Sequence, residues 1–129
     1  KGYRFSTVIH PTAIIADDVE IGEGVQIMAG VIIQTGCKIG DNTIINTGAV
    51  VEHDCIIEKH VHIAPGAVLS GGVRIGTMSH VGSSATIIQG IEIGANCLVG
   101  AGSVVIQNVP DNSKALGVPA KIFYKKESY

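Results

Sequence analysis

The sequence contains no tryptophan and no long apolar run among its 129 residues. Without such a run, no membrane-spanning segment is expected. The formal net charge is only −2, so a broad electrostatic attraction to nucleic acid is not expected either. No signal peptide is visible in the sequence, which begins at Lys1. The length suits a single domain, and the 17 glycines suit a stack of tight corners.

A six-residue repeat organises the chain from Ile9 to Pro110. Every sixth residue is a large aliphatic, and the residue four places later is small in nearly every repeat. Neither column contains a charge. A period of six fits neither an amphipathic helix nor an alternating strand, and it is typical of a parallel β-helix built from hexapeptides. The aliphatic column consists of Ile9, Ile15, Ile21, Ile27, Ile33, Ile39, Ile45, Val51, Ile57, Ile63, Leu69, Ile75, Val81, Ile87, Ile93, Val99 and Val105.

A third column, from Thr12 to Asn108, predicts the turns. Thirteen of its seventeen members are Gly, Asn or Asp, which enter positive-φ conformations at low cost. Each hexad is therefore a short strand followed by a tight corner. If three hexads close one triangular coil, the coil has eighteen residues. Residues eighteen apart should then lie on top of each other.

The repeat divides the chain into three parts. Residues 9–110 are expected to form the β-helix, residues 1–8 an N-terminal cap or linker, and residues 111–129 a C-terminal cap and tail, formed by a short helix or strand. A cap is required at the end of a solenoid. At the other end, the open edge of the first coil invites pairing. The residues expected to cover it are Tyr3, Phe5 and Val8.

His53 is the polar residue whose spacing best suggests chemistry. It lies two places after the inward Val51, and Gly71 lies one coil above it. Because Gly71 has no side chain, the imidazole should border a notch with a backbone N–H nearby. Histidine is readily poised as a base near neutral pH, although a solvated surface histidine is the alternative. Asp54 occupies a corner position, so either a turn role or orientation of the His53 ring explains it.

The other histidines and the cysteines have simpler interpretations. His60 lies in the corner column and is expected to be a turn residue. His62 faces outward with His80 one coil above; the two could form a metal pair, but separate roles are preferred. The three cysteines belong to the small inward column, where they act as small hydrophobes. A disulfide between stacked coils would distort the ladder, so a reducing cytoplasm is favoured. These cysteines are Cys37, Cys55 and Cys97.

Three features together resemble the hexapeptide-repeat acyltransferases: the unbroken hexads, Glu-His-Asp-Cys at 52–55 and Gly-Val-Pro-Ala-Lys at 117–121. The chain is most similar to the sialic-acid O-acetyltransferase and bacillosamine-pathway N-acetyltransferase family, and its residues 8–13 resemble the join before that family's β-helix. The resemblance implies a left-handed β-helix and a cytoplasmic homotrimer, with an acetyl-CoA groove between neighbouring prisms and no metal. A role in bacterial surface polysaccharide biosynthesis is also implied.

The resemblance also implies roles for particular residues. His53 matches the family's general base, and Asp54 matches the acidic residue beside it. His62 and the N–H of Gly71 match groups that contact the acetyl carbonyl of the cofactor. Five further positions match the backbone along the pantetheine arm and the terminal motif beside the cofactor. These positions are Gly100, Ala101, Val118, Pro119 and Lys121.

The implied reaction is direct transfer of acetyl from acetyl-CoA to an amine or hydroxyl of a sugar or sugar nucleotide. Family members usually carry an α/β domain before the β-helix that binds the sugar nucleotide, and its absence from this sequence leaves the acceptor open. One alternative is a γ-type carbonic-anhydrase-like metalloenzyme, which needs converging zinc ligands. Its histidine pair is four residues apart, whereas the spacings from His53 onward are 7, 2 and 18. A non-catalytic structural β-helix is the other alternative.

Overall fold

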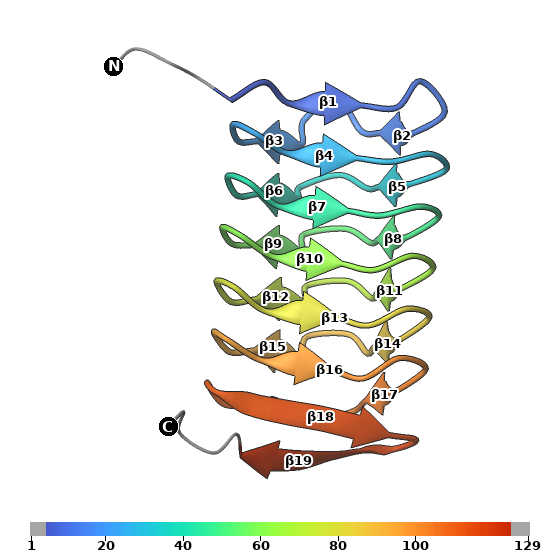
Figure 1. Cartoon of the computed structure of the whole chain (residues 1–129). Helices are drawn as coiled ribbons and strands as arrows, with labels where there is room; N and C mark the ends of the chain where they lie inside the picture. Colours follow the sequence, from blue (N-terminus) through green and yellow to red (C-terminus); the bar gives the residue numbers. More distant parts are fainter. Residues whose placement is uncertain (1–4, 125–129) are drawn as a thin grey trace.

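The computed structural model describes residues 5–124, which form a left-handed parallel β-helix of triangular cross-section (Figure 1). Three parallel sheets, here sheets A, B and C, form the walls of the prism. Each strand within the coils is two residues long and is followed by a turn. No stretch of residues 5–124 forms a helix long and apolar enough to cross a bilayer.

Consecutive strands belong to different sheets, so each sheet takes every third strand. Sheet A contains β1 (Val8–Ile9), β4 (Gln26–Ile27), β7 (Ile44–Ile45), β10 (His62–Ile63), β13 (His80–Val81), β16 (Leu98–Val99), β18 (Ser113–Gly117) and β19 (Ala120–Tyr124). Sheet B contains β2 (Ile14–Ile15), β5 (Ile32–Ile33), β8 (Val50–Val51), β11 (Val68–Leu69), β14 (Thr86–Ile87) and β17 (Val104–Val105). Sheet C contains β3 (Glu20–Ile21), β6 (Lys38–Ile39), β9 (Ile56–Ile57), β12 (Arg74–Ile75) and β15 (Glu92–Ile93).

The register confirms the eighteen-residue coil. His62 pairs with His80, and Val50 pairs with Val68, each across one coil. The large aliphatic column points inward and is fully buried through the middle of the prism, as at Ile63 and Leu69. Ile9, in the first coil, remains 45% exposed because no coil covers it.

The corners confirm the third column of the repeat. Every corner position from Gly24 to Gly102 has a positive φ. Most are Gly or Asn, but His60 and Met78 adopt the same conformation, with φ of 58° and 65°. Both side chains are exposed, so neither meets packed neighbours that would oppose the turn. His60 is thus a turn residue, as its column predicts.

The hydroxyl groups of the small inward column are hydrogen-bonded to the backbone. Thr43 Oγ1 donates to the carbonyl of Glu58 at 2.8 Å, and Ser79 Oγ donates to the carbonyl of Gly94 at 2.6 Å. Because a buried hydroxyl is costly unless it is hydrogen-bonded, these bonds explain why polar residues are tolerated in an otherwise apolar column.

The C-terminal end is closed by a hairpin. Strand β18 pairs with β16 in parallel and with β19 in antiparallel orientation. The Val118–Pro119 peptide bond between them is cis, and Gly117 donates its N–H to Ser103 Oγ at 2.9 Å. The cap is therefore built from strands. At the other end, Phe5 and Val8 remain 72% and 59% exposed, and Tyr3 lies outside the described residues.

The outward faces of the three sheets differ in chemistry. In each strand the residue before the inward aliphatic points outward, because side chains alternate along a strand. On sheet C most of these residues are charged, whereas on sheet B none is charged and all are β-branched. Sheet A presents a mixed face that includes two histidines. The outward residues of sheet B are Ile14, Ile32, Val50, Val68, Thr86 and Val104.

Candidate active site

His53 and Asp54 form the corner that joins β8 to β9, between sheets B and C. His53 Nδ1 lies 3.0 Å from Asp54 Oδ2, and the two side chains are 54% and 68% exposed. An ionised carboxylate only accepts hydrogen bonds, so Nδ1 of a neutral His53 carries the proton. Nε2 is then unprotonated and available as a base.

Gly71 lies directly against the His53 ring, as the eighteen-residue spacing predicts. A Cβ built on Gly71 would lie 2.6 Å from His53 Cε1 and would overlap Nε2. The next residue, Gly72, donates its N–H to the His53 carbonyl at 2.9 Å. The absence of a side chain at position 71 therefore makes the space that the imidazole occupies.

We expect Gly71→Ala to move the imidazole and to lower any proton transfer by His53 about 10²-fold, with little change in stability. The added methyl would meet an exposed side chain, which can turn away. The matched comparison is Gly76→Ala, where the methyl would lie 2.6 Å from the backbone atoms Ala95 N and Gly94 C. That variant should lose thermal stability instead. Steady-state kinetics and thermal melts of both variants provide the check, and a fully active Gly71→Ala would contradict this packing.

A second cluster of polar side chains lies on the outer face of sheet A. The rings of His62 and His80 meet edge-to-face, with centroids 4.7 Å apart and an interplanar angle of 88°. Asn46 Nδ2 lies 3.3 Å from His62 Nε2. Burial lowers the pKa of His62, and the proximity of His80 lowers it further. His62 is thus favoured as a neutral imidazole.

One chain does not bring His53 and His62 together. The corner between sheets B and C is the vertex of the triangle opposite sheet A, and the packed core lies between them. His53, Asp54 and Gly71 meet at that vertex, whereas His62 lies on the opposite wall. A site that uses both histidines therefore needs two copies of the chain.

The expected cofactor-binding backbone gathers along another edge of the prism. Gly100 and Ala101 belong to the corner between β16 and β17, where sheets A and B meet, and Gly100 lies against Leu116 of the hairpin. In Figure 1 the turn between β18 and β19 lies below these corners, on the right-hand edge. Val118, Pro119 and Lys121, at or next to this turn, are exposed. This edge borders the outer face of sheet A, on which His62 lies.

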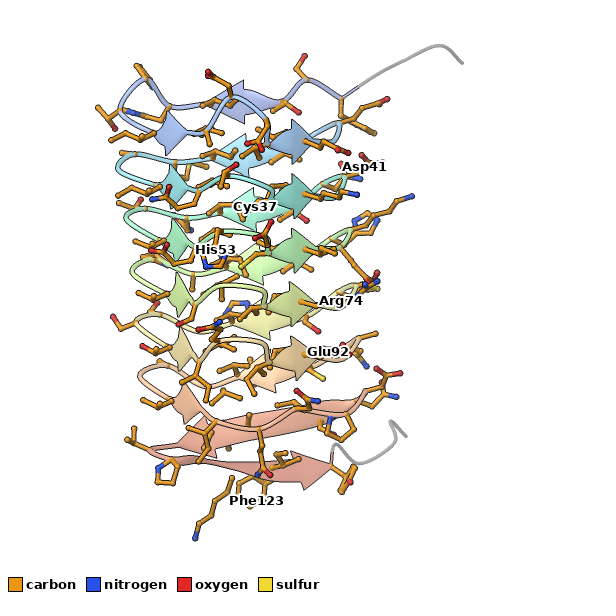
Figure 2. The ribbon with its side chains drawn as sticks, turned by 180° about the vertical axis from the view of Figure 1, so that it is seen from behind. Cys37, Asp41, His53, Arg74, Glu92 and Phe123 are labelled. Atoms are coloured by element: carbon orange, nitrogen blue, oxygen red, sulfur yellow. The ribbon has the colours of Figure 1, made fainter. Side chains whose placement is uncertain are left out.

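A hollow of about 440 Å³ lies on sheet C. Its lining includes Arg74, whose guanidinium lies 2.7 Å from Glu58 and lowers the pKa of that carboxyl. Figure 2 shows Arg74 and Glu92, both on this face, well apart from His53. The hollow contains none of the expected site residues, so its charges belong to the solvated face of the prism.

Two further groups of side chains bear on the chemistry. All three cysteines are free and buried; the neighbouring Cys37 thiol and burial both raise the pKa of Cys55, which disfavours a nucleophilic thiolate there. Among residues 5–124, no group of three or more His, Cys, Asp or Glu side chains converges as metal ligands do.

Comparison with known families agrees with the repeat. The family of bacterial transferase hexapeptides, described by six repeats, matches residues 18–53 and 36–71, and the hexapeptide repeat of succinyl-transferase matches residues 72–107. This chain belongs to the hexapeptide-repeat transferases. No curated protein matches this hexapeptide-repeat chain in sequence.

Solved structures with the same fold include several at more than 30% identity. PerB from Caulobacter crescentus, in complex with CoA and GDP-perosamine, is 48% identical with a TM-score of 0.93, over 95% of this chain and 59% of that one. The acetyltransferase domain of PglB from Neisseria gonorrhoeae, in complex with acetyl coenzyme A, is 39% identical with a TM-score of 0.93, over 95% and 60%. WeeI from Acinetobacter baumannii is 34% identical with a TM-score of 0.87, over 89% and 57%. The hexapeptide-repeat chain thus spans about three fifths of these structures.

Sequence reasoning missed Asn46 as a site residue. Asn46 directly follows β7, sixteen residues before His62, and reaches that ring from the neighbouring coil. Asn46 could have been identified from its column, the set of positions that lie eighteen residues apart in successive coils. At the corner between sheets A and B, the members of that column in the three later coils are the small residues Ala64, Gly82 and Gly100, whereas His10 and Met28 occupy it in the two earlier coils. Asn46 is the one amide among these six described positions.

Proposed function

We propose that this chain is the catalytic β-helix of an acetyl-CoA-dependent acetyltransferase, which acts on an amine or hydroxyl of a sugar or sugar nucleotide. The observation that carries the proposal is the His53–Asp54 pair, with His53 Nε2 against Gly71. The similarity to PerB, solved with CoA and GDP-perosamine, and to PglB, solved with acetyl coenzyme A, supports the cosubstrate and the acceptor class. GDP-perosamine N-acetyl transferase, at 47% identity, favours an amine over a hydroxyl.

The proposed reaction is a single direct transfer. Asp54 holds the proton on His53 Nδ1, and Nε2 removes a proton from the acceptor nitrogen as that nitrogen attacks the thioester carbonyl. The C–N bond forms, the C–S bond breaks, and CoA leaves as the thiolate. The Gly71 N–H and His62 stabilise the oxyanion that develops on the carbonyl, a contribution of about 3 kcal/mol for each donor.

The cofactor is proposed to lie along the edge where sheets A and B meet. From His62 to the hairpin turn at 117–119 this edge descends about three coils, or roughly 14 Å at the usual strand spacing. Gly82 and Gly100 lie on it without side chains that would obstruct an extended pantetheine arm. Lys121 lies near the end of the edge, exposed and positively charged, and would attract the phosphates of CoA.

The outward faces support a trimer in which copies share their sites. Sheet B presents an apolar stripe and sheet A the His62 cluster, whereas sheet C is charged and suited to solvent. A head-to-tail contact between different faces closes into a ring under cyclic symmetry. Placing the His53 corner of one copy against sheet A of the next would bring His53 and His62 into one site.

The proposed activity is tested by release of free CoA thiol from acetyl-CoA in the presence of nucleotide-linked amino sugars. We expect thiol release only when an acceptor with a free amine is present, with the product identified as the amide by mass spectrometry. Matched sugars that carry a hydroxyl in place of the amine provide the control for N- against O-transfer. Failure to bind CoA in calorimetry, together with no thiol release, would contradict the proposal and favour a structural β-helix.

The shared site makes a separate prediction for mixed trimers. His53→Ala and His62→Ala chains should each be nearly inactive alone, but co-expression at equal amounts should restore about one quarter of the wild-type rate. In random trimers, that is the share of sites in which an intact His53 meets an intact His62 from the next copy. Light scattering must show trimers in every sample. A co-expressed sample as inactive as its parents would exclude sites shared between copies.

A further inference from the structure

The orientation of the Asn46 amide follows from its hydrogen bonds. Its Oδ1 accepts from the backbone N–H of Thr47 at 2.8 Å, and Thr47 Oγ1 lies 3.3 Å from the same oxygen. The reversed amide would place its NH₂ group against the Thr47 N–H, which is also a donor. The amide NH₂ is therefore the group that faces His62 Nε2, at 3.3 Å.

The amide orientation determines which nitrogen of His62 is protonated. An amide NH₂ only donates hydrogen bonds, so Nε2 of His62 must accept and cannot carry a proton. In the neutral ring the proton then lies on Nδ1. A proton on Nε2 as well would place the Nε2–H of His62 against the NH₂ group of Asn46, so that two donors would face each other.

The surroundings of His62 also favour the neutral ring. In sheet A it lies between Ile44 and His80, and the edge-to-face contact with His80 constrains the plane of the ring. His80 is followed in the sheet by the apolar Leu98. His80 is the titratable group that acts on the charge of His62; in the proposed trimer, His53 and Asp54 of the next copy would also face it.

We propose that Asn46 and His80 are positioning residues that hold His62 as a neutral imidazole with its proton on Nδ1. Nδ1–H is then the donor that His62 presents to the developing oxyanion, a role that rests on the proposed function. The tautomer of His62 does not depend on the proposed function, because the tautomer follows from contacts within the chain.

The tautomer can be measured directly in the full chain. Long-range ¹H–¹⁵N correlation spectra of histidine-labelled protein distinguish the two nitrogens, and the sequence has only five histidines. Loss of one set of signals in His62→Gln assigns the ring. At pH 7 without ligand, we expect a neutral His62 with the proton on Nδ1. A proton on Nε2, or an imidazolium, would overturn the proposal.

Two substitutions separate the contributions of the neighbours. Asn46→Asp replaces the donor by an acceptor of the same shape, so the His62 proton should move to Nε2, and kcat should fall about 10²-fold because the donor atom is lost. His80→Phe keeps a ring but removes its charge, so His62 should keep its tautomer and titrate at higher pH. Asn42→Asp, the same change at a corner where the side chain lies against Gly24 of the preceding coil, is the control and should alter neither the His62 tautomer nor kcat.

The outcomes distinguish this inference from the proposed function. If Asn46→Asp leaves the proton on Nδ1, the role of Asn46 is wrong; if His80→Phe leaves the His62 titration unchanged, the role of His80 is wrong. If the tautomer is as stated but no acceptor is acetylated, the proposed function fails and the tautomer assignment remains. If Asn46→Asp moves the proton while kcat is unchanged, His62 is not the oxyanion donor.

Discussion

His53→Ala should reduce kcat by about 10²–10⁴-fold while leaving the fold and most of the CoA affinity intact. The side chain is on an exposed corner and is 54% exposed, so its removal opens no cavity in the core. Its proposed task, removal of a proton in the transition state, contributes to the rate and not to cofactor binding. Steady-state kinetics with calorimetry of CoA binding and thermal melts separate these effects.

Two other histidines provide matched controls for this experiment. His60→Ala removes another histidine, which lies at the corner between sheets C and A with φ of 58°. This substitution should leave kcat nearly unchanged. His62→Ala should weaken both turnover and CoA binding, because His62 is proposed to contact the acetyl group. Near-normal turnover in His53→Ala, combined with loss in His60→Ala, would mean that the wrong histidine has been assigned as the base.

The period of six determined most of the fold. It predicted the inward columns, the corner column and the stacking of residues eighteen apart, which together place Gly71 against His53. These features follow from volume and backbone conformation at each position, so the residues themselves reveal them. Handedness came from the resemblance alone, because crossovers between parallel strands are usually right-handed and nothing in the composition of the hexads reverses that preference.

The division of the site between two walls was contained in the sequence but is easily overlooked. His53 and His62 are nine residues apart, which is half of an eighteen-residue coil, so they must lie on opposite sides of the prism. The Asn46 contact is different. It depends on a side-chain rotamer and on the Thr47 hydrogen bond, and neither is determined by the repeat. The repeat therefore predicts where backbone positions lie, whereas the polar contacts depend on side-chain rotamers that the repeat does not determine.

Ile63→Ala should destabilise the protein by about 2–5 kcal/mol, because it removes most of a buried aliphatic side chain. Ile63 is fully buried in the aliphatic column and stacks between Ile45 and Val81. The coils above and below are fixed by parallel ladders, so they cannot close the cavity that the truncation leaves. Lys38→Ala, at an exposed position on sheet C, is the control and should change little.

The opposite change tests the small column of the same coil. Ala67 is fully buried beside a corner, so Ala67→Leu should cost about 1–3 kcal/mol through overpacking. Denaturant midpoints must be compared at equal chain concentration, because assembly couples stability to concentration. The two substitutions together distinguish a filled interior from a loose one: truncation and enlargement should both lower the midpoint. A midpoint for Ala67→Leu equal to that of the wild type would show that the corner has spare volume and that the inward columns are not close-packed.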